Sequence, residues 1–376
     1  MKSGVYIHIP FCEQRCGYCA FTVAVAPVET FEPYVKRLIR EIELSGWNEP
    51  VETIFLGGGT PSLIEPKLIR EILATLPQGA TEISLEANPG TFTDEKLETY
   101  REVGINRISL GAQSFSDRDL EAVGRIHRAA HVVDDFATLR RDGFKNINID
   151  LIAGLPSQDE TIWSSNLDWL ERLQPEHVSV YMLELDEKSP WSRGAPEIPA
   201  DDVFVRQYQL ACDRLEAAGY RHYEISNWAK PGFECRHNLK YWTGARYRGF
   251  GVGAHSYDGD ARFWNTSSLA EYAAQIDAGH LPMTGREVLT REIRLEEAFM
   301  LGLRQTAGFS IRAVAEDLGI RYPSDWFTRV ETLQSGGLVS FDGDILKLTS
   351  AGWLVATGVT EDLIWPTLLS TSEVTP

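Results

Sequence analysis

Strand-like and helix-like segments alternate along the first 220 residues of this 376-residue chain, with short connections between them. Six segments are rich in β-branched and other apolar residues, and helical apolar spacing follows each one. The strand-like segments are 5–10, 51–56, 82–87, 107–112, 147–152 and 178–185. Such alternation predicts a parallel sheet covered by helices. Six units are too few for an eight-stranded barrel. We therefore predict an α/β fold with a partial (β/α)6 TIM-like barrel, and an open doubly wound sheet is the alternative.

The rest of the chain changes character twice. The stretch 220–260 is rich in Gly, Trp, Tyr and His and is expected to be site-building chain, and we predict an irregular extension at 221–285. Three helical segments follow, and then a hairpin around Asp342-Gly343-Asp344. Helices followed by a short hairpin are typical of a winged helix. The predicted domains are the barrel at 1–220, the extension at 221–285 and a C-terminal α+β winged-helix-like module at 286–376.

The charge balance limits the partners. The chain has 54 acidic and 36 basic residues, a formal charge of −18, and a field of that sign repels phosphate backbones. We therefore expect no nucleic-acid partner and assign the C-terminal module to structural or protein contacts. The sequence has no run of about 18 apolar residues, so we expect no membrane span. Three of the five cysteines lie within eight residues and no export signal precedes them, which favours a metal or redox role in the cytoplasm.

The clustered cysteines are Cys12, Cys16 and Cys19, which follow the first strand. Three thiolates can bind three irons of a cubane cluster and leave the fourth iron open, as a ligand that binds the metal requires. The alternative is a structural zinc site with His8 or Cys235 as the fourth ligand, although such sites usually pair their ligands as C-x2–4-C. A disulfide would leave one of the three cysteines unpaired.

Glycines and polar residues follow the later strands. Gly57-Gly58-Gly59-Thr60-Pro61 ends the second strand, where glycines allow a backbone with exposed N–H groups to approach a ligand. Four polar residues fall at or near the ends of the next strands: Glu86, Gln113, Arg125 and Asp150. In parallel barrels this edge holds the site, and several strands supply its residues. Each residue alone could cap a helix or turn, but together with the cysteines they favour a site.

The segment Tyr6-Ile7-His8-Ile9-Pro10-Phe11-Cys12, with Cys16 and Cys19, resembles the radical S-adenosylmethionine (SAM) superfamily. This resemblance implies a [4Fe–4S] cluster on the three cysteines, with SAM bound to the open iron. It also implies a SAM pocket with a wall residue from the sixth strand. The implied pocket residues are Tyr6, Tyr18, Gly58, Gly59, Thr60, Glu86, Gln113, Arg125, Asp150 and Glu184.

Within the superfamily, nearly the whole chain resembles the branch of oxygen-independent coproporphyrinogen III oxidase (HemN) and the HemW heme chaperones. The segments Gly111-Ala112-Gln113-Ser114-Phe115 and Asp150-Leu151-Ile152-Ala153-Gly154-Leu155-Pro156 are part of this resemblance. The oxidase carries a further cysteine where this chain has Phe21, and it has a longer segment before its cluster. Both departures favour the chaperone branch.

The segment Cys235-Arg236-His237-Asn238-Leu239-Lys240-Tyr241-Trp242 resembles the His-Asn motif associated with heme in these chaperones. The resemblance implies a heme site at His237, Asn238, Tyr241 and Cys235, with His237 or Cys235 as the ligand. Alternatively, His237 hydrogen-bonds a loop and the aromatic residues belong to the core. His255 is a weaker ligand candidate, and Cys212 is expected to be a packing thiol.

We therefore expect a chaperone that binds heme and a SAM-ligated cluster and passes heme to hemoproteins such as respiratory enzymes, with a homodimer implied by the family. One alternative is an enzyme that oxidatively decarboxylates coproporphyrinogen III, and another is a non-catalytic zinc-binding interaction protein. Whether the chain is an enzyme stays open. Among the other histidines, His8 is expected to orient the cluster loop, and His127 and His131 to be structural.

Overall fold

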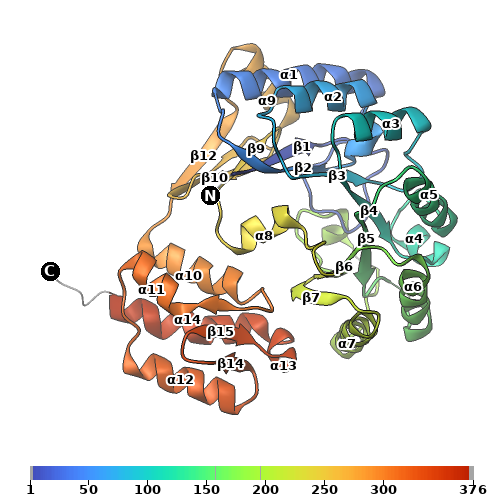
Figure 1. The fold of residues 1–376 in the computed structure, drawn as a ribbon. Helices are drawn as coiled ribbons and strands as arrows, with labels where there is room; N and C mark the ends of the chain where they lie inside the picture. The colour runs from blue at the N-terminus through green and yellow to red at the C-terminus, as the bar shows by residue number, and fades with distance from the viewer. Residues whose placement is uncertain (1–2, 157, 195, 372–376) are drawn as a thin grey trace.

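Six parallel strands curve into a partial barrel in the computed structural model, which describes residues 3–156, 158–194 and 196–371 (Figure 1). The strands are β1 (Ser3–Ile9), β2 (Val51–Gly58), β3 (Glu82–Ala87), β4 (Arg107–Gln113), β5 (Ile147–Ala153) and β6 (His177–Met182). Their spatial order follows their order in the chain. A doubly wound sheet would reverse that order near its middle, so the partial barrel is confirmed. The ends of the predicted first and last domains, residues 1–2 and 372–376, lie outside the described residues.

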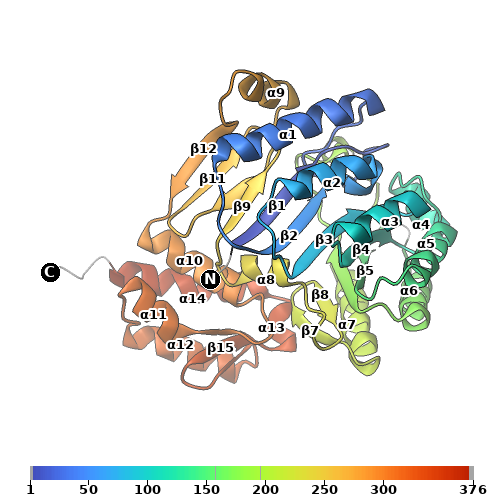
Figure 2. The ribbon, with the colours of Figure 1, turned by 45° about the horizontal axis from the view of Figure 1, so that its top comes forward.

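Helices cover the outer face of this arc (Figures 1 and 2). They are α1 (Phe31–Ser45), α2 (Pro66–Ala74), α3 (Asp94–Glu102), α4 (Asp117–Ala122), α5 (Ala129–Arg141), α6 (Glu160–Leu173) and α7 (Asp201–Ala217). Helix α2 is an example of how their sequences favour this packing. Pro66 occupies its first turn, and Leu68, Ile69 and Ile72 form its buried face. Helix–strand connections of this kind bring the carboxyl ends of all six strands to one edge.

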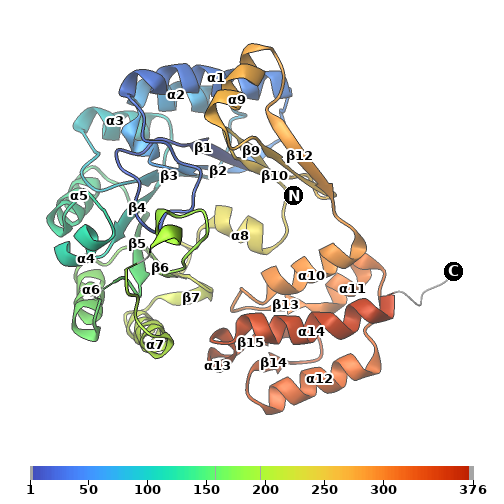
Figure 3. The ribbon, with the colours of Figure 1, turned by 180° about the vertical axis from the view of Figure 1, so that it is seen from behind.

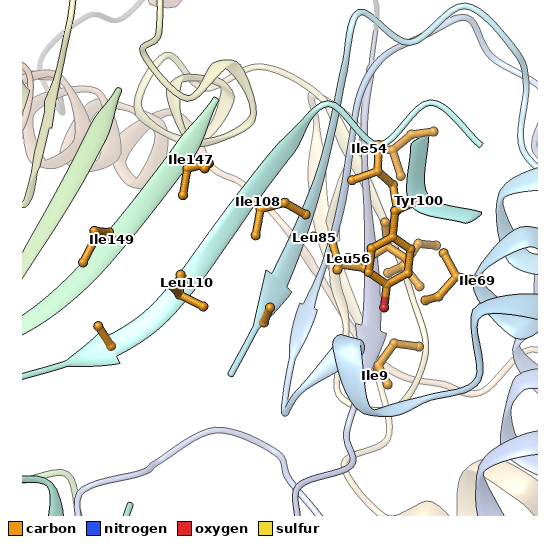
Figure 4. Close-up of a cluster of buried hydrophobic side chains, with 14 of the residues drawn as sticks. Ile9, Ile54, Leu56, Ile69, Leu85, Tyr100, Ile108, Leu110, Ile147 and Ile149 are labelled. Atoms are coloured by element: carbon orange, nitrogen blue, oxygen red, sulfur yellow. The ribbon is translucent and has the colours of Figure 1, made fainter. Parts of the chain in front are cut away.

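The core lies between the outer face of the strands and these helices. Figure 4 shows aliphatic side chains from neighbouring strands packed beside Tyr100 of α3 and Ile69 of α2. Because side chains alternate across a strand, the residues between them face the lumen of the barrel. In β4, Ile108 and Leu110 belong to the core, whereas Arg107 and Ser109 line an inner cavity.

The expectation of irregular chain at 221–285 is wrong. The segment forms β7 (Arg221–Glu224), β8 (Asn227–Ala229), α8 (Arg236–Trp242), β9 (Tyr247–Phe250), β10 (His255–Tyr257), β11 (Ala261–Asn265), α9 (Leu269–Asp277) and β12 (Met283–Val288). Strand β8 pairs with β6, and β9 pairs in parallel with β1, so the segment extends both edges of the arc. Helix α8 lies inside the curve of the sheet (Figures 1 and 3). Most of these strands are short, and β8 and β9 pair with strands that are distant in sequence, so periodicity did not reveal them.

The C-terminal module has its own core and its own three-stranded sheet, as expected of a winged-helix-like unit. It contains α10 (Arg291–Gly302), β13 (Phe309–Ser310), α11 (Ile311–Leu318), α12 (Ser324–Ser335), β14 (Val339–Phe341), β15 (Ile345–Leu348), α13 (Ser350–Trp353) and α14 (Ala356–Thr371). The Ile225 N–H donates to the Arg304 carbonyl at 3.0 Å, and the Thr306 N–H to the Tyr223 carbonyl at 3.2 Å. These bonds join the module to the edge of the barrel. No helix in the described ranges is long and apolar enough to cross a membrane.

Candidate functional site

A cavity of about 560 Å³ runs through the barrel lumen. The cavity is lined by all three clustered cysteines, by every residue of the implied SAM pocket and by three of the four heme candidates. These residues are Cys12, Cys16, Cys19, Tyr6, Tyr18, Gly58, Gly59, Thr60, Glu86, Gln113, Arg125, Asp150, Glu184, His237, Asn238 and Tyr241. The fold thus brings side chains from positions 6 to 241 into one space. Their roles remain predictions.

The cysteine loop is folded against the end of the barrel by its own backbone. The Cys12 N–H donates to the Ala24 carbonyl at 3.0 Å, and the Cys19 N–H to the Cys16 carbonyl at 3.2 Å. The Arg15 guanidinium donates to the carbonyls of Cys19 and Lys188, at 3.1 and 2.9 Å. The loop therefore presents its three thiols together at the cavity.

The thiols have donors beside them that suit thiolates. The Thr60 hydroxyl lies 3.7 Å from Cys12 Sγ, and Arg125 Nη1 lies 3.7 Å from Cys16 Sγ. Burial raises the pKa of Cys12 to about 11, so in the free protein this thiol stays protonated. Iron or another metal would favour the thiolate form.

The spacing of the thiols bears on the zinc alternative. Across the residues that the structure describes, no three His, Cys, Asp or Glu side chains gather closely enough to hold one metal ion. A cluster uses a separate iron for each thiolate and so needs them farther apart than one ion does. His8 and Cys235 also have other partners. His8 Nε2 lies 2.7 Å from the Thr22 carbonyl, and Cys235 Sγ lies 3.7 Å from Glu82 Oε1. Neither contact involves the three clustered cysteines.

The glycine segment works differently from the expectation of exposed N–H groups. The Gly58 N–H donates to Glu86 Oε2 at 3.0 Å, the Gly59 N–H to the Ile9 carbonyl at 2.8 Å and the Thr60 N–H to the Phe11 carbonyl at 2.8 Å. A Cβ on Gly59 would lie 2.6 Å from that Phe11 carbonyl oxygen. The glycines therefore allow the β2 loop to pass close to the cysteine loop, rather than offering free donors to a ligand.

Carboxyl groups line the middle of the cavity. Burial raises the pKa of Glu86 to about 7, and the nearby Asp150 adds to the shift. Burial also raises the pKa of Asp150, which accepts hydrogen bonds from Asn148 Nδ2 at 2.7 Å and the Ser109 hydroxyl at 3.1 Å. Gln113 ends β4 with a φ of 65°, a left-handed conformation that residues other than glycine rarely adopt. Carboxylates in this position suit a cationic or hydroxyl-bearing ligand.

Arg125 donates hydrogen bonds to residues that follow β3 and lie within β4, next to the cysteine site. Its Nη2 atom donates to Asn88 Oδ1 and to the Gly111 carbonyl, both at 2.6 Å. Asn88 in turn donates to the Thr60 hydroxyl at 2.9 Å. Asn88 therefore connects the arginine to the glycine segment. Sequence reasoning missed it, although it follows the third strand by a single residue, as the other pocket residues follow theirs.

The His-Asn segment forms α8, which fills the amino-terminal end of the lumen. The Arg236 and His237 N–H groups both donate to the Glu82 carboxylate at 3.0 Å. The His237 ring is buried, with Nδ1 2.9 Å from the Thr53 hydroxyl and Nε2 3.0 Å from the Tyr241 hydroxyl. Burial, with Lys240 and then Arg107 adding to it, lowers the pKa of His237 to about 3. The ring is therefore neutral, and both of its nitrogens are engaged.

The remaining candidates lie elsewhere. Cys235 is fully buried at the amino-terminal cap of α8 and does not line the cavity. His255 is exposed on β10, where it stacks on Trp264, and Cys212 is half-buried against the barrel core. His127 Nε2 lies 3.1 Å from the Ala112 carbonyl, and His131 accepts the Arg128 N–H within the cap of α5, so both have structural partners.

Polar residues at the starts of the strands were also missed. Arg107, Ser109, Asn148 and Ser179 all line the cavity. Asn148 Nδ2 donates to both serine hydroxyls, at 2.7 and 3.0 Å. The signal that could have found them is alternation, since these polar residues alternate with apolar residues along their strands.

The chain is similar to known proteins along its whole length. Residues 6–168 match the model of the radical SAM superfamily, and residues 289–355 match the HemN C-terminal domain. The heme chaperone HemW of Bacillus subtilis is 34% identical over 372 residues, covering 96% of this chain and 98% of that protein. The heme chaperone HemW of Escherichia coli is 38% identical over 266 residues, covering 67% of this chain and 69% of that protein.

A solved structure shares the fold. Coproporphyrinogen III oxidase (HemN) from Escherichia coli, described as a radical SAM enzyme, superposes with a TM-score of 0.85 at 22% identity and covers 96% of this chain and 90% of that one. At this identity the match supports the partial barrel and the C-terminal module. With the full-length similarity to the chaperones, it leads to one conclusion: the chain belongs to the HemW family within the radical SAM superfamily.

Proposed function

We propose that the protein is a heme chaperone that binds heme and a SAM-ligated [4Fe–4S] cluster and passes the heme to hemoproteins. One observation carries the proposal: the three clustered cysteines and the His-Asn helix α8 line the same cavity. A cofactor at the cysteines and a second ligand near α8 would therefore share one cavity. Membership of the HemW family supports heme as that second ligand.

The cysteine end fits the cluster by its chemistry. Cys12, Cys16 and Cys19 supply three thiolate donors, and the half-buried Arg125 beside Cys16 compensates negative charge. When bound, the cluster would supply an open iron for SAM. Glu86 and Asp150 would face the ammonium or ribose groups of SAM, because both carboxyls line the adjoining wall.

The α8 end supplies the heme candidates, but His237 is not free in this conformation. Its Nε2 atom contacts the Tyr241 hydroxyl at 3.0 Å, and its Nδ1 contacts Thr53 at 2.9 Å. Ligation through Nε2 therefore requires the Tyr241 side chain to move. His237, Asn238 and Tyr241 face the cavity, so a tetrapyrrole in the lumen would meet them directly.

The test is a heme titration on the full chain after anaerobic reconstitution with iron and sulfide. Wild type, His237→Ala and the matched control His280→Ala, an exposed histidine, are compared by the Soret band. We expect stoichiometric binding by wild type and the control, and at least tenfold weaker binding by His237→Ala. Unchanged binding by His237→Ala would move the ligand to Cys235 or His255.

A parallel assay separates the chaperone from the oxidase. Coproporphyrinogen III, SAM and a reductant are added to the reconstituted protein, and decarboxylated product is measured. We expect none. Turnover would overturn the chaperone proposal and make Phe21, which is 68% exposed at the rim of the cavity, a tolerated variation of the oxidase motif.

The remaining parts of the proposal concern location and partners. The described cysteines are all free thiols, which suits the reducing cytoplasm. We place the protein there, with respiratory hemoproteins as acceptors and a homodimer as its assembly. Co-purification with an acceptor after heme loading, and sedimentation with and without the cluster, test these parts.

A further inference from the structure

A second arginine lies in the lumen, and its side chain is buried and unpaired among the residues that the structure describes. Arg107 begins β4, is only 2% exposed and lines the cavity. Its Nε atom is buried without a hydrogen-bond partner, and no hydrogen bond or ion pair joins its guanidinium to any residue the structure describes. Arg125, by contrast, donates to Asn88, Gly111 and Cys16. The two arginines therefore differ in whether the protein supplies hydrogen-bond acceptors for their guanidinium groups.

The carboxylates nearest to Arg107 are engaged elsewhere. Glu82 and Asp150 act on it electrostatically. The Glu82 carboxylate accepts the N–H groups of Arg236 and His237 at the start of α8. Asp150 accepts hydrogen bonds from Ser109 and Asn148. The fold has therefore placed acids near the arginine without pairing any of them with it.

Buried charged groups normally have partners, because an unpaired buried charge is costly. A guanidinium offers five donors in a planar fork that matches a carboxylate in two parallel hydrogen bonds. The lumen around Arg107 also holds the rings of Phe55, His237 and Tyr241. Such a site suits an aromatic ligand that carries an acidic arm. A singly charged arm suits it better than a phosphate, because Glu82 and Asp150 repel a second negative charge.

We propose that Arg107 binds a propionate carboxylate of the tetrapyrrole, in the half of the lumen between Asp150 and α8. This inference rests on the proposed function, since it assumes a tetrapyrrole in the cavity. It adds a recognition contact from β4, well separated in sequence from the cysteines and from the His-Asn motif. The contact would orient the macrocycle with one acidic edge toward the amino-terminal end of the barrel.

The test compares tetrapyrroles with free and esterified propionates on the reconstituted full chain, at matched detergent concentration. The probes are hemin, coproporphyrin III and their methyl esters, followed by absorbance and fluorescence. We expect wild type to bind the free acids at least tenfold more tightly than the esters. In Arg107→Met the dissociation constant of the acids should rise at least tenfold and that of the esters should not change. Arg107→Lys keeps the positive charge but lacks the planar fork of donors, so its dissociation constant for the acids should lie between those of wild type and Arg107→Met.

The controls separate this inference from the proposed function. Arg70→Met, at an exposed arginine on the outer face of α2, should match wild type. Thermal unfolding checks that Arg107→Met is folded, and the acid-to-ester comparison on wild type needs no variant. If hemin does not bind but coproporphyrin III binds more tightly than its ester, the proposal that heme is the ligand is wrong. The inference that Arg107 binds a carboxylate is then still supported. Equal affinity of wild type for acids and esters, equal losses for both in Arg107→Met, or no binding of either tetrapyrrole would overturn the inference.

Discussion

The two ends of the barrel lumen are built by different means. At the carboxyl ends of the strands, the site comes from backbone that adjoins the strands, and the cysteine and glycine loops are bonded to each other. At the other end, α8 fills the lumen and is held by side chains of Thr53 and Glu82, which precede His237 by 184 and 155 positions. The first end is fixed by the sheet, whereas the second depends on a few long-range contacts. The two ends therefore differ in how far apart in the chain the segments lie that hold each one in place.

The largest expected effect comes from removing a cysteine. Cys12→Ala should abolish cluster binding, because the site has three thiols and, in the described part of the chain, no fourth cysteine lines the cavity. Iron and acid-labile sulfide after anaerobic reconstitution measure the loss. Cys212→Ala is the matched control and should retain a full cluster. A complete cluster in Cys12→Ala would contradict the assignment of the cysteine end.

The α8 end should respond to Glu82. Glu82→Gln removes the charge that accepts two buried N–H groups of α8, and we expect a loss of about 2–3 kcal/mol in local stability. Hydrogen exchange of residues 236–242 should accelerate accordingly, while the cluster content stays unchanged. Glu95→Gln, at an exposed position on α3, is the control. If α8 exchanges no faster in Glu82→Gln, the helix is held by other contacts.

A pH effect on SAM binding is expected at Glu86, in the wall of the proposed SAM pocket. The pKa of Glu86 is raised from 4.5 to about 7, so its ionised fraction rises about tenfold between about pH 6 and pH 8. Cationic SAM should therefore bind about tenfold more tightly at the higher pH, and Glu86→Gln should flatten this dependence. The sign for folding is opposite: Glu86 lowers stability as pH rises from 4.5 to about 7, because the unfolded chain loses its proton first. A flat profile in wild type, measured by equilibrium dialysis, would remove Glu86 from the SAM site.

The smallest effect is expected at Asn88, which connects Arg125 to Thr60. Asn88→Ala should cost about 1–2 kcal/mol of stability and weaken SAM binding only a few-fold, because both partners keep other contacts. Chemical denaturation and dialysis check the two values. Asn106→Ala, at the start of β4 outside the cavity, is a comparison with similar hydrogen-bond loss. A large loss of cluster in Asn88→Ala alone would make this residue part of the cluster site.

The same contrast explains what the sequence could predict. The barrel strands and the residues Glu86, Gln113 and Asp150 were predictable because strand periodicity is local and parallel strands bring their ends to one edge. The strands of 221–285 were not, since β8 and β9 are only three and four residues long and pair with β6 and β1 far away in the chain.

The polar lining of the lumen was missed for a related reason. Arg107 and Asn148 lie at the starts of strands, where the rule that sites occupy strand ends gives them no weight. The hydrogen bonds that the N–H groups of residues 58–60 donate were also unpredictable, because they depend on how the glycine loop packs against other segments. Residue types indicated which groups could act, but the contacts among distant segments determine which of them are free.

The most direct test of the shared cavity is hydrogen exchange of the reconstituted full chain with and without hemin. We predict slower exchange in residues 236–242 and 107–113, since a ligand in the lumen would bridge α8 and β4. Exposed segments such as β12 should be unaffected. Protection confined to β10–β12 or to the C-terminal module, with α8 and β4 unchanged, would contradict the central claim that heme and the cluster occupy one cavity.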